Sequence, residues 1–384
     1  MYETIQEGKA IIRIKKADKI SKEMEVFYNP VMKLNRDISI LLLNSIDNNN
    51  MQIALPLTGS GIRGLRFLKE LKKNKIKSIS FNDYDKKAVE SIKNSFSLNR
   101  IKNKKIVVYN EDANLFLLNS SGFDYIDVDP FGTSNYYLDS AVKRISRNGI
   151  LAVTNTDTAA LTGTYPKACV RKYWSTAKKD YMMHETGLRI LIRKVQLVGM
   201  QYEKALFPVF SYFKDHYFRI FFQCVKGKKL CDGIALEHGM FNDAGPLWTG
   251  SLWDGKLVNK MYSTLKNYNG EINNTKDSIL IKNEKTINNT ITNDNKSINK
   301  NNEINNNELL KFLKIIKDES KINSVGFYDI HQIAKKKKLK IIMKKNEIIK
   351  KIKKKGFKAA DTHFSGIGIR SDIDYDKLLT LLKE

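Results

Sequence analysis

Short apolar runs alternate with amphipathic stretches from residue 51 onward, and this alternation predicts a repeating order of strands and helices. The strand-like runs are QIAL, SISFND, KIVVYNED, DYIDVD, GILAVTNTD and YFRIFFQCV. Between them, DKKAVESIKNSFSLN and NYYLDSAVKRIS space their apolar residues for one face of a helix. Strands that alternate with helices are typical of βαβ units around a parallel sheet, so we expect an α/β domain over residues 1–225.

The pattern changes in the last third of the chain, which we expect to form a smaller α+β domain over residues 226–384. Around residues 267–307 the sequence is rich in Asn, Lys, Ile and Thr, which favours a flexible insertion because little of it can build a core. After it, ELLKFLKIIKDES, FYDIHQIAKKKKLK and KNEIIKKIKKKGFKAADTHFSGIGIR predict three helices and then an extended pair. That order resembles a winged-helix module.

The composition points to a polyanionic partner. The 384 residues include 67 Lys and Arg against 41 Asp and Glu, a formal net charge of +26. Dense positive charge lies in the predicted C-terminal helices, at Lys335 to Lys338 and Lys350 to Lys355. These lysines could bind phosphates or simply form a solvated helix face. The total charge of the chain favours phosphate binding. No apolar run is long enough to span a bilayer and no apolar signal segment follows Met1, so we expect a cytoplasmic protein without membrane contact.

The three cysteines are too few and too dispersed for a disulfide framework. Cys224, Cys231 and His238 recur at equal gaps, but they lack the close Cys-x-x-Cys pairs of a structural zinc site. We therefore predict no metal. We also assign no role to His184, His216 or His363, because an isolated histidine is more often structural.

Glycines and acids mark the ends of successive predicted strands. LTGSGIRGLRF follows the first strand and opens a helix, so Gly59 and Gly61 occupy a loop that can approach a ligand closely, although tight packing alone would explain them. Asp83, or alternatively Asp85, follows about 20 residues later, at the distance where an acid binds ribose hydroxyls in such folds. Asp112 ends the third strand, where it can reach an adenine amino group. Each acid alone is more often a helix N-cap, but together they line one crevice.

The fourth strand leaves the sheet at the sequence DPFG beside the same crevice. Tyr125, Ile126 and Val128 favour a strand, and Pro130 ends it because proline cannot donate to a ladder. An Asp-Pro pair followed by glycine is ordinarily a turn. Here Asp129 could instead accept an N–H of an exocyclic amine and stabilise the positive charge that develops as the amine attacks a methyl sulfonium such as S-adenosylmethionine.

Seven segments together resemble the tRNA guanine-26 N2-dimethyltransferase family in its archaeal form. They are FYNPVMKLNRD, GSGIRGLRF, NEDAN, DVDPFGT, TNTDTAALTGTYPKACVRKYW, KDHYFRIFF and THFSGIGIR, and they occur in the family's order over nearly the whole chain. The resemblance implies a class I, Rossmann-like methyltransferase domain, S-adenosylmethionine as donor, and transfer of two methyl groups to N2 of guanine 26 in tRNA. It also implies a C-terminal tRNA-binding domain. We expect the protein to be a monomer.

The resemblance assigns roles to residues by motif. It implies that Asp129 is the catalytic carboxylate, and that the donor is contacted by Arg36, Arg66, Asp83, Asp112 and Ala113. Pro130 fixes the backbone beside the substrate base. We further expect Phe27 and Phe131 to hold the flipped guanine between them, with a core position for Phe27 as the alternative.

Basic segments outside the cavity are expected to bind tRNA phosphates. Lys167, Arg171 and Lys172 would do so near the pocket mouth, with a solvated helix as the alternative. The segment THFSG (residues 362–366) and the lysine-rich helices would bind tRNA phosphates outside the catalytic pocket.

Two other function classes stay open at this point. An amino methyltransferase with another DNA or RNA target is possible because Asp-Pro-aromatic motifs also serve adenine N6 and cytosine N4. A noncatalytic RNA-binding protein on a degenerate fold is disfavoured by the complete set of Arg36, Asp83, Asp112 and Asp129.

Overall fold

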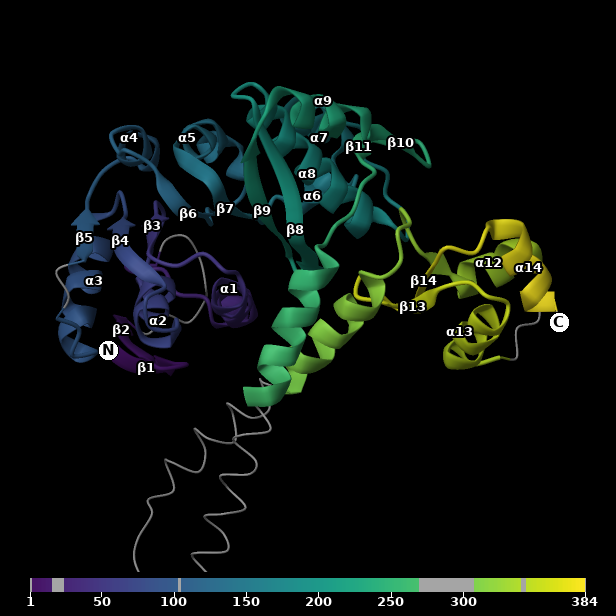
Figure 1. Ribbon diagram of the computed structural model, residues 1–384, viewed down its shortest axis with the longest axis horizontal. Coiled ribbons are helices and arrows are strands. Elements are labelled where there is room, and N and C mark those ends of the chain that lie inside the picture. Colours follow the sequence, from purple (N-terminus) through teal and green to yellow (C-terminus); the bar gives the residue numbers. More distant parts are fainter. Residues whose placement is uncertain (1, 16–23, 103–104, 269–306, 340–342, 384) are drawn as a thin grey trace, which may run out of the picture.

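A seven-stranded sheet organises the larger part of the chain (Figure 1). The computed structural model describes residues 2–15, 24–102, 105–268, 307–339 and 343–383. The strands lie in the order β5-β4-β3-β6-β7-β9-β8, and all are parallel except β9. Their bounds are β3 Met51–Leu55, β4 Ile76–Asn82, β5 Ile106–Tyr109, β6 Phe123–Val128, β7 Ile145–Asn155, β8 Lys204–Lys214 and β9 Tyr217–Lys226. The predicted α/β fold of this part of the chain is therefore confirmed.

Helices cover both faces of this sheet. One group packs with α2, and the other packs with α5. The first group is α1 Lys33–Ser45, α2 Ile62–Glu70 and α3 Lys86–Leu98; the second is α4 Ala113–Leu118, α5 Leu138–Arg144 and α8 Met183–Met200. The strand order reverses between β3 and β6, so the chain crosses the sheet on opposite faces before and after that point. A crevice opens at the carboxyl ends of the strands where such a reversal occurs.

The sequence pattern missed two features of this domain. The first is the hairpin of β1 Tyr2–Glu7 and β2 Ala10–Lys15, whose second strand packs against α2 and α3. The second is strand β8, which contains Pro208. The pairing of β8 with β9 shifts register between Pro208 and Phe210, so the proline sits at an irregularity of an edge strand.

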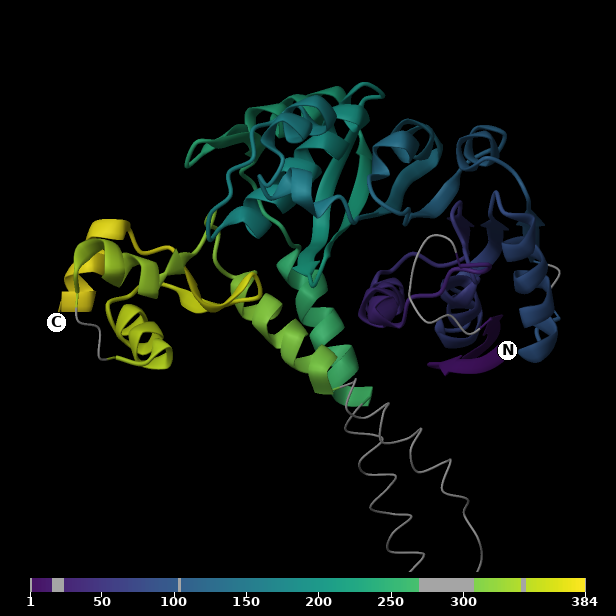
Figure 2. The same cartoon turned by 180° about the vertical axis from the view of Figure 1, so that it is seen from behind.

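Residues that follow the sheet pack mostly on the same core. The chain is helical over residues 255–268 and 307–319, and these two helices lie side by side in both views (Figures 1 and 2). Their buried apolar residues belong to the main core. The shorter elements are η1 Pro30–Met32, η2 Ser134–Tyr137, α6 Thr158–Leu161, α7 Pro166–Tyr173, α9 Lys228–Leu236, β10 His238–Phe241 and β11 Ala244–Trp248. The Asn-rich segment, apart from its outermost residues, lies outside the described residues.

The C-terminal module has the predicted winged-helix order. Following the helix at residues 307–319, the elements are β12 Tyr328–Asp329, α12 Ile330–Lys337, α13 Lys345–Lys354, β13 Ala359–Thr362, β14 Ser365–Ser371 and α14 Tyr375–Lys383. The strands form an antiparallel sheet in the order β12-β14-β13. This module has its own core, built from Ile333, Ile348, Ile352, Leu378 and Leu381 among others. None of the helices in the described part of the chain is long and apolar enough to cross a membrane.

A buried ionic cluster joins this module to the part of the chain built on the seven-stranded sheet. Arg370 on β14 binds Glu185 on α8 at 2.6 Å and Glu319 at 3.0 Å. Glu319 also accepts from His363 Nδ1 at 2.5 Å, and Glu185 accepts from Arg189 at 2.9 Å. These five residues, the Arg370 cluster, are almost completely buried. Because each charge has an opposite partner, the cluster can stay ionised away from water, and it fixes the two parts of the chain to one another.

The cluster includes part of the THFSG segment. His363, Thr362 and Phe364 of THFSG are buried, and the His363 backbone N–H donates to Glu319. These three residues form an interdomain contact, whereas Ser365 is partly exposed and Gly366 is exposed, so the role of the segment in tRNA docking stays a prediction. The neighbouring lysines at residues 335–338 and at 350, 353 and 354 are exposed.

Candidate active site

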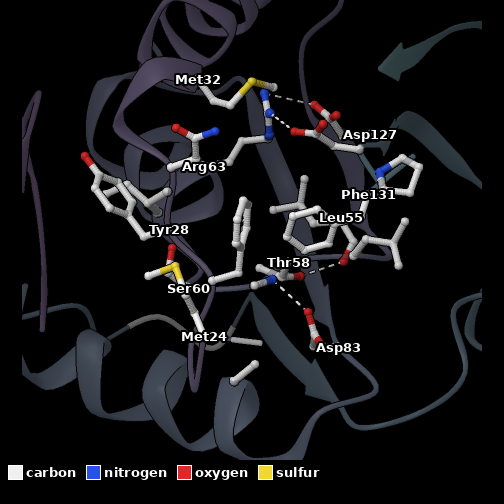
Figure 3. Close-up of a pocket in the computed structure, with 18 of the residues that line it drawn as sticks. Met24, Tyr28, Met32, Leu55, Thr58, Ser60, Arg63, Asp83, Asp127 and Phe131 are labelled. Atoms are coloured by element: carbon white, nitrogen blue, oxygen red, sulfur yellow. Dashed lines mark hydrogen bonds and ion pairs between the residues drawn. The ribbon is translucent and has the colours of Figure 1, made fainter. Parts of the chain in front are cut away.

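A cavity of about 520 Å³ opens at the carboxyl edge of the sheet, where β3, β4 and β6 end. Its lining comes from these three strand exits and from residues 24–36, which precede and begin α1. Figure 3 shows Arg63 and Asp127 at one end of the cavity and Asp83 at the other. The structure therefore places the acids expected from the second and fourth strands in one crevice.

The glycine loop is tied to Asp83. Gly59 has a φ of +54°, and a Cβ at this position would lie 3.1 Å from the backbone oxygen of Phe27, so the loop requires glycine for two reasons. Its N–H donates to Asp83 Oδ2 at 2.7 Å. Burial raises the pKa of Asp83 above its usual value. The alternative acid, Asp85, caps α3 by accepting from Lys87 N at 2.9 Å, although it too lines the cavity.

Asp112 and Ala113 stand apart from the cavity lining. Asp112 is the N-cap of α4 and accepts from the backbone N–H groups of Asn114 and Leu115. Ala113 is buried at the first position of the same helix. The structure therefore gives Asp112 the ordinary capping role, one strand away from Asp83 in the sheet.

Arg36 and Arg66 converge on a glutamate that the sequence analysis did not single out. Glu7 is 3% exposed, and it accepts from Arg36 Nε at 2.7 Å and from Arg66 Nη1 at 2.9 Å. Burial alone would raise the pKa of Glu7, but the positive charge of Arg36 and then that of Arg66 outweigh burial and lower it from 4.5 to about 2. Arg36 lines the cavity, whereas Arg66 lies behind it and also binds Asp37 and Glu70.

Asp129 lies at the end of β6 with one oxygen held and one available. Its Oδ2 accepts from Arg63 Nη2. Among the described residues nothing donates to Oδ1, and the carboxylate remains 21% exposed within the cavity lining. Arg63 itself is fixed because its Nη1 donates to Asn35 Oδ1 and to Ser39 Oγ, both at 3.0 Å.

A second carboxylate below Asp129 anchors the same arginine. Asp127 is 2% exposed and lies 3.4 Å from Arg63 Nη1. It also accepts two hydrogen bonds of 2.8 Å from Arg219 on β9, and one of 2.5 Å from Tyr125. Burial would raise the pKa of Asp127, but the charges of Arg219 and Arg63 outweigh that effect and lower it. Two arginines and two aspartates thus form one network, in which Arg63, Asp127 and Asp129 line the cavity and Asp129 is the more exposed of the two carboxylates.

The aromatic residues expected to hold a base contact one another in this structure. The ring centroids of Phe27 and Phe131 are 4.1 Å apart, with an interplanar angle of 71°. Both line the cavity together with Pro130. Phe27 is partly buried and its backbone oxygen accepts from Ser60 N, so it is not a core residue, while Phe131 is 53% exposed.

The histidines occupy different places in the structure. His216 lines the mouth of the cavity, His184 stacks on Phe213, and His238 bonds to Gln196. Within the described ranges no group of three or more His, Cys, Asp or Glu side chains could hold a metal ion, so Cys224, Cys231 and His238 do not form such a site.

Three charged residues of the site were missed from the sequence: Glu7, Arg63 and Arg219. Arg63 stands three residues before Arg66 in an amphipathic helix, where the pattern alone does not separate a cavity residue from a supporting one. The one available signal was the DVD sequence of β6. Alternating residues face the same side of a strand, so Asp127 and Asp129 together require cations on that side.

Comparison with known proteins gives a consistent picture. The family model of N2,N2-dimethylguanosine tRNA methyltransferases matches residues 8–243 and 278–383. The chain is 33% identical to the tRNA (guanine(26)-N(2)/guanine(27)-N(2))-dimethyltransferase of Aquifex aeolicus, with 100% of this chain and 96% of the relative covered. It is 35% identical to the tRNA (guanine(26)-N(2))-dimethyltransferase of Methanocaldococcus jannaschii, with coverages of 96% and 95%.

A solved structure agrees over the full length. Trm1 from Pyrococcus horikoshii, determined with S-adenosyl-L-methionine, superposes with a TM-score of 0.82 at 32% identity and covers 100% of both chains. This match confirms the fold class predicted from the sequence.

The lowered pKa of Glu7 predicts how the stability of the protein depends on pH. Its folded pKa lies below its unfolded one, so the stabilisation is complete above pH 4.5 and is lost as the pH falls towards 2. The difference between 4.5 and 2, at 1.36 kcal/mol per pH unit, gives about 3 kcal/mol. We expect Glu7→Gln to lower the free energy of unfolding by about that amount at pH 7 and by little near pH 2.

Denaturant unfolding at several pH values measures this difference. Glu90→Gln is the matched control, since Glu90 is exposed on α3 and forms no ion pair within the described residues. It should leave stability unchanged at every pH. A gap between the parent and Glu7→Gln that stays constant from pH 7 to pH 2 would contradict the role of Glu7.

Proposed function

The chain belongs to the N2,N2-dimethylguanosine tRNA methyltransferase family, and on this premise we propose how its residues transfer two methyl groups from S-adenosylmethionine to N2 of guanine 26 in tRNA. The observation that carries the mechanism is Asp129, which ends β6 in the same cavity as the glycine loop, with one oxygen held by Arg63 and the other available.

The cavity has a volume of about 520 Å³ and is lined by acidic, basic and apolar residues, and we propose that it holds S-adenosylmethionine. Gly59 keeps the loop after β3 close to the ligand space, and Asp83 lies beside it at the end of β4. We propose that Asp83 binds the ribose hydroxyls and that Arg36 binds at the opposite side of the donor. Arg66 would act indirectly by holding Glu7 and so Arg36. Asp112 and Ala113 would support the adenine end of the site through the loop before α4. When bound, the donor supplies an electrophilic methyl group on a sulfonium.

Asp129 is proposed to act on the attacking amine. The lone pair of guanine N2 is delocalised into the base, and a hydrogen bond from N2–H to Asp129 Oδ1 favours the pyramidal nitrogen that can attack the methyl carbon. As the N–C bond forms and the S–C bond breaks, nitrogen becomes positively charged and the carboxylate stabilises that charge. The proton then leaves nitrogen by way of Asp129. Arg63 fixes the carboxylate, so that little reorganisation is needed during the reaction.

Replacement of Asp129 tests the mechanism. We expect Asp129→Asn, which keeps the shape but not the negative charge, to reduce turnover by about 10²- to 10⁴-fold, and Asp129→Ala at least as much. The measurement is nucleoside analysis of an unmodified tRNA transcript after incubation with S-adenosylmethionine, with mapping of the modified position. Asp232→Asn, an exposed change on α9, is the control.

The possible outcomes distinguish a wrong assignment of the catalytic residue from a wrong assignment of the substrate. Dimethylguanosine from Asp129→Ala at the parent rate would remove Asp129 from the mechanism. No product from the parent enzyme, with donor binding intact, would contradict the tRNA target and point to another nucleic acid.

Phe27, Pro130 and Phe131 are proposed to hold the flipped guanine. Stacking on both faces needs about 7 Å between the ring planes, so the two rings must separate before a base enters. Phe27 is anchored through its backbone oxygen, whereas Phe131 is half exposed beside Gly132, which has open space around it. We therefore infer that Phe131 moves to admit the base, whereas Phe27 keeps its position.

Phe27→Ala should reduce kcat/KM for tRNA by about tenfold, because one stacked face is worth about 1–3 kcal/mol. Phe27→Tyr keeps the ring and should retain activity. Calorimetric titration with the donor checks that the nearby glycine loop is intact in both variants. Unchanged tRNA affinity and turnover in Phe27→Ala would contradict the proposed stack.

Residues 226–384 are proposed as the tRNA-binding part and residues 1–225 as the catalytic part. The exposed lysines at 335–337 on α12 support a tRNA-binding role for the C-terminal module within residues 226–384. We propose a cytoplasmic monomer, for which light scattering should give 44.2 kDa; a mass twice as large, or recovery of the chain with membranes, would contradict this.

Neutralising Lys335, Lys336 and Lys337 with alanine should weaken tRNA binding and reduce its salt dependence. Removal of one lysine–phosphate interaction lowers the slope of log K against log salt by about 0.9 on duplex. Lys72→Ala with Lys73→Ala, exposed before β4 at the opposite edge of the sheet, is the control. An unchanged salt slope in the triple variant would rule out phosphate binding by these three lysines.

A further inference from the structure

An exposed surface beside the catalytic loop carries aromatic and basic side chains that the proposed mechanism does not use. On α7, Val170 and Arg171 lie three and four residues after Lys167, so the three side chains share one helix face, and Trp174 follows as the C-cap, with Lys194 Nζ 3.1 Å from the centre of its ring. All four are exposed, whereas Cys169 and Tyr173 on the other face are buried. Helices on the surface of a domain usually turn charged residues outward; this one turns out two large apolar side chains as well.

Two exposed tyrosines lie next to α7, one as its N-cap and one beside a residue that bonds to it. Tyr165, immediately before α7, is 63% exposed, and Tyr136 on η2 is 73% exposed. The side chain of Asn135, next to Tyr136, donates to the backbone oxygen of Lys172 at 2.9 Å, which ties η2 to α7. We call the surface formed by Tyr136, Tyr165, Lys167, Arg171 and Trp174 the α7 surface.

The α7 surface is fixed to the loop that follows Asp129. Tyr173 donates its hydroxyl towards Thr133 Oγ1 at 3.1 Å and Asp157 Oδ2 at 3.0 Å. Gly132 N donates to Thr156 Oγ1 at 2.7 Å, and the backbone N–H of Thr156 returns a bond to Gly132 O at 2.9 Å. These bonds connect α7 to the residues that follow Asp129, and Thr156 itself lines the cavity.

The charges indicate a polyanion rather than a protein or a lipid. Lys167 and Arg171 form no ion pair within the described residues, so their charges are available to a ligand. Aromatic rings interleaved with cations match single-stranded nucleic acid, whose bases stack and whose phosphates pair with the cations. A nucleotide next to a base drawn out of its helix no longer has its stacking partner and presents such a face.

We propose that the α7 surface binds the nucleotides that flank the target guanine in the substrate RNA, with Tyr136 and Tyr165 stacking on bases and Lys167 and Arg171 binding phosphates. This inference rests on the proposed function and assigns the surface a role in holding the distorted strand after the guanine has left its stack. The residues on it are substrate-positioning residues, because none reaches the reacting atoms.

The stacking part is tested with Tyr136→Leu and Tyr136→Phe. The leucine variant should raise KM for a tRNA transcript by about tenfold, while the phenylalanine variant should retain the parent value because it keeps the π face. The same pair of substitutions at Tyr165 tests the second position. Donor binding by calorimetry should be unchanged in all four. Leucine and phenylalanine variants that both behave as the parent would overturn the stacking role.

The phosphate part is tested with Lys167→Ala combined with Arg171→Ala. We expect weaker tRNA binding and a salt slope smaller by about 1.4, the value for two phosphates on single-stranded RNA. The control is Lys72→Ala with Lys73→Ala, which removes the same charge at the far edge of the sheet. If tRNA affinity and the salt slope change only as much as in the control variant, the proposal is overturned. If the parent enzyme itself makes no dimethylguanosine, the proposed function fails; if the parent methylates tRNA and the variants match it, only this inference fails.

Discussion

The active site depends on the burial of Asp127 between two arginines. Arg219 is completely buried in the sheet and Arg63 nearly so, and such cations can remain charged there only if a carboxylate faces them. Asp127 balances one of these charges, and Asp129 balances the other from the edge of the cavity. The substrate-facing carboxylate is thus the outermost member of a network whose remaining members are rigid. A buried ion pair is a poor source of stability in itself. What it provides here is an orientation for Asp129 that does not rely on solvent-exposed contacts.

The Arg370 cluster also fixes the structure through buried opposite charges, here between the C-terminal module and the rest of the chain. Glu185 on α8 and Glu319 belong to parts that pack on the main core, while Arg370 and His363 belong to the C-terminal sheet. Burial would raise the pKa of Glu319, but the charges of His363 and Arg370 lower it to about 2, so this carboxylate is ionised at neutral pH. Since the module has a separate apolar core, this cluster is an important connection that holds its exposed lysines at a set position relative to the cavity. An enzyme that selects one guanine in a folded RNA benefits from such a fixed spacing.

The sequence predicted the elements whose signals are local. Alternating apolar runs placed β4, β6 and β9, and the break at Pro130 located Asp129 at a strand exit. Glu7 was missed because its partners are 29 and 59 residues away, and a single glutamate in a short N-terminal hairpin carries no pattern. Arg66 was predicted to contact the donor, yet the cavity contains Arg63; two arginines one helical turn apart are indistinguishable until their carboxylate partners are known. Asp112 shows the opposite case, since the local capping signal correctly described its contacts.

The periodicity of the strand explains why these parts work together. Side chains two residues apart on β6 project to the same side, so Asp127 and Asp129 both face Arg63. Their exposure increases in the direction of the chain, from 2% at Asp127, through the partly exposed Asp129, to 53% at Phe131. Rigidity therefore decreases towards the substrate over five residues. The carboxylate that must be aligned is held from below, and the aromatic ring that must move to admit a base lies where nothing holds it. Pro130 separates the two because its fixed φ keeps motion of the ring from disturbing the acid.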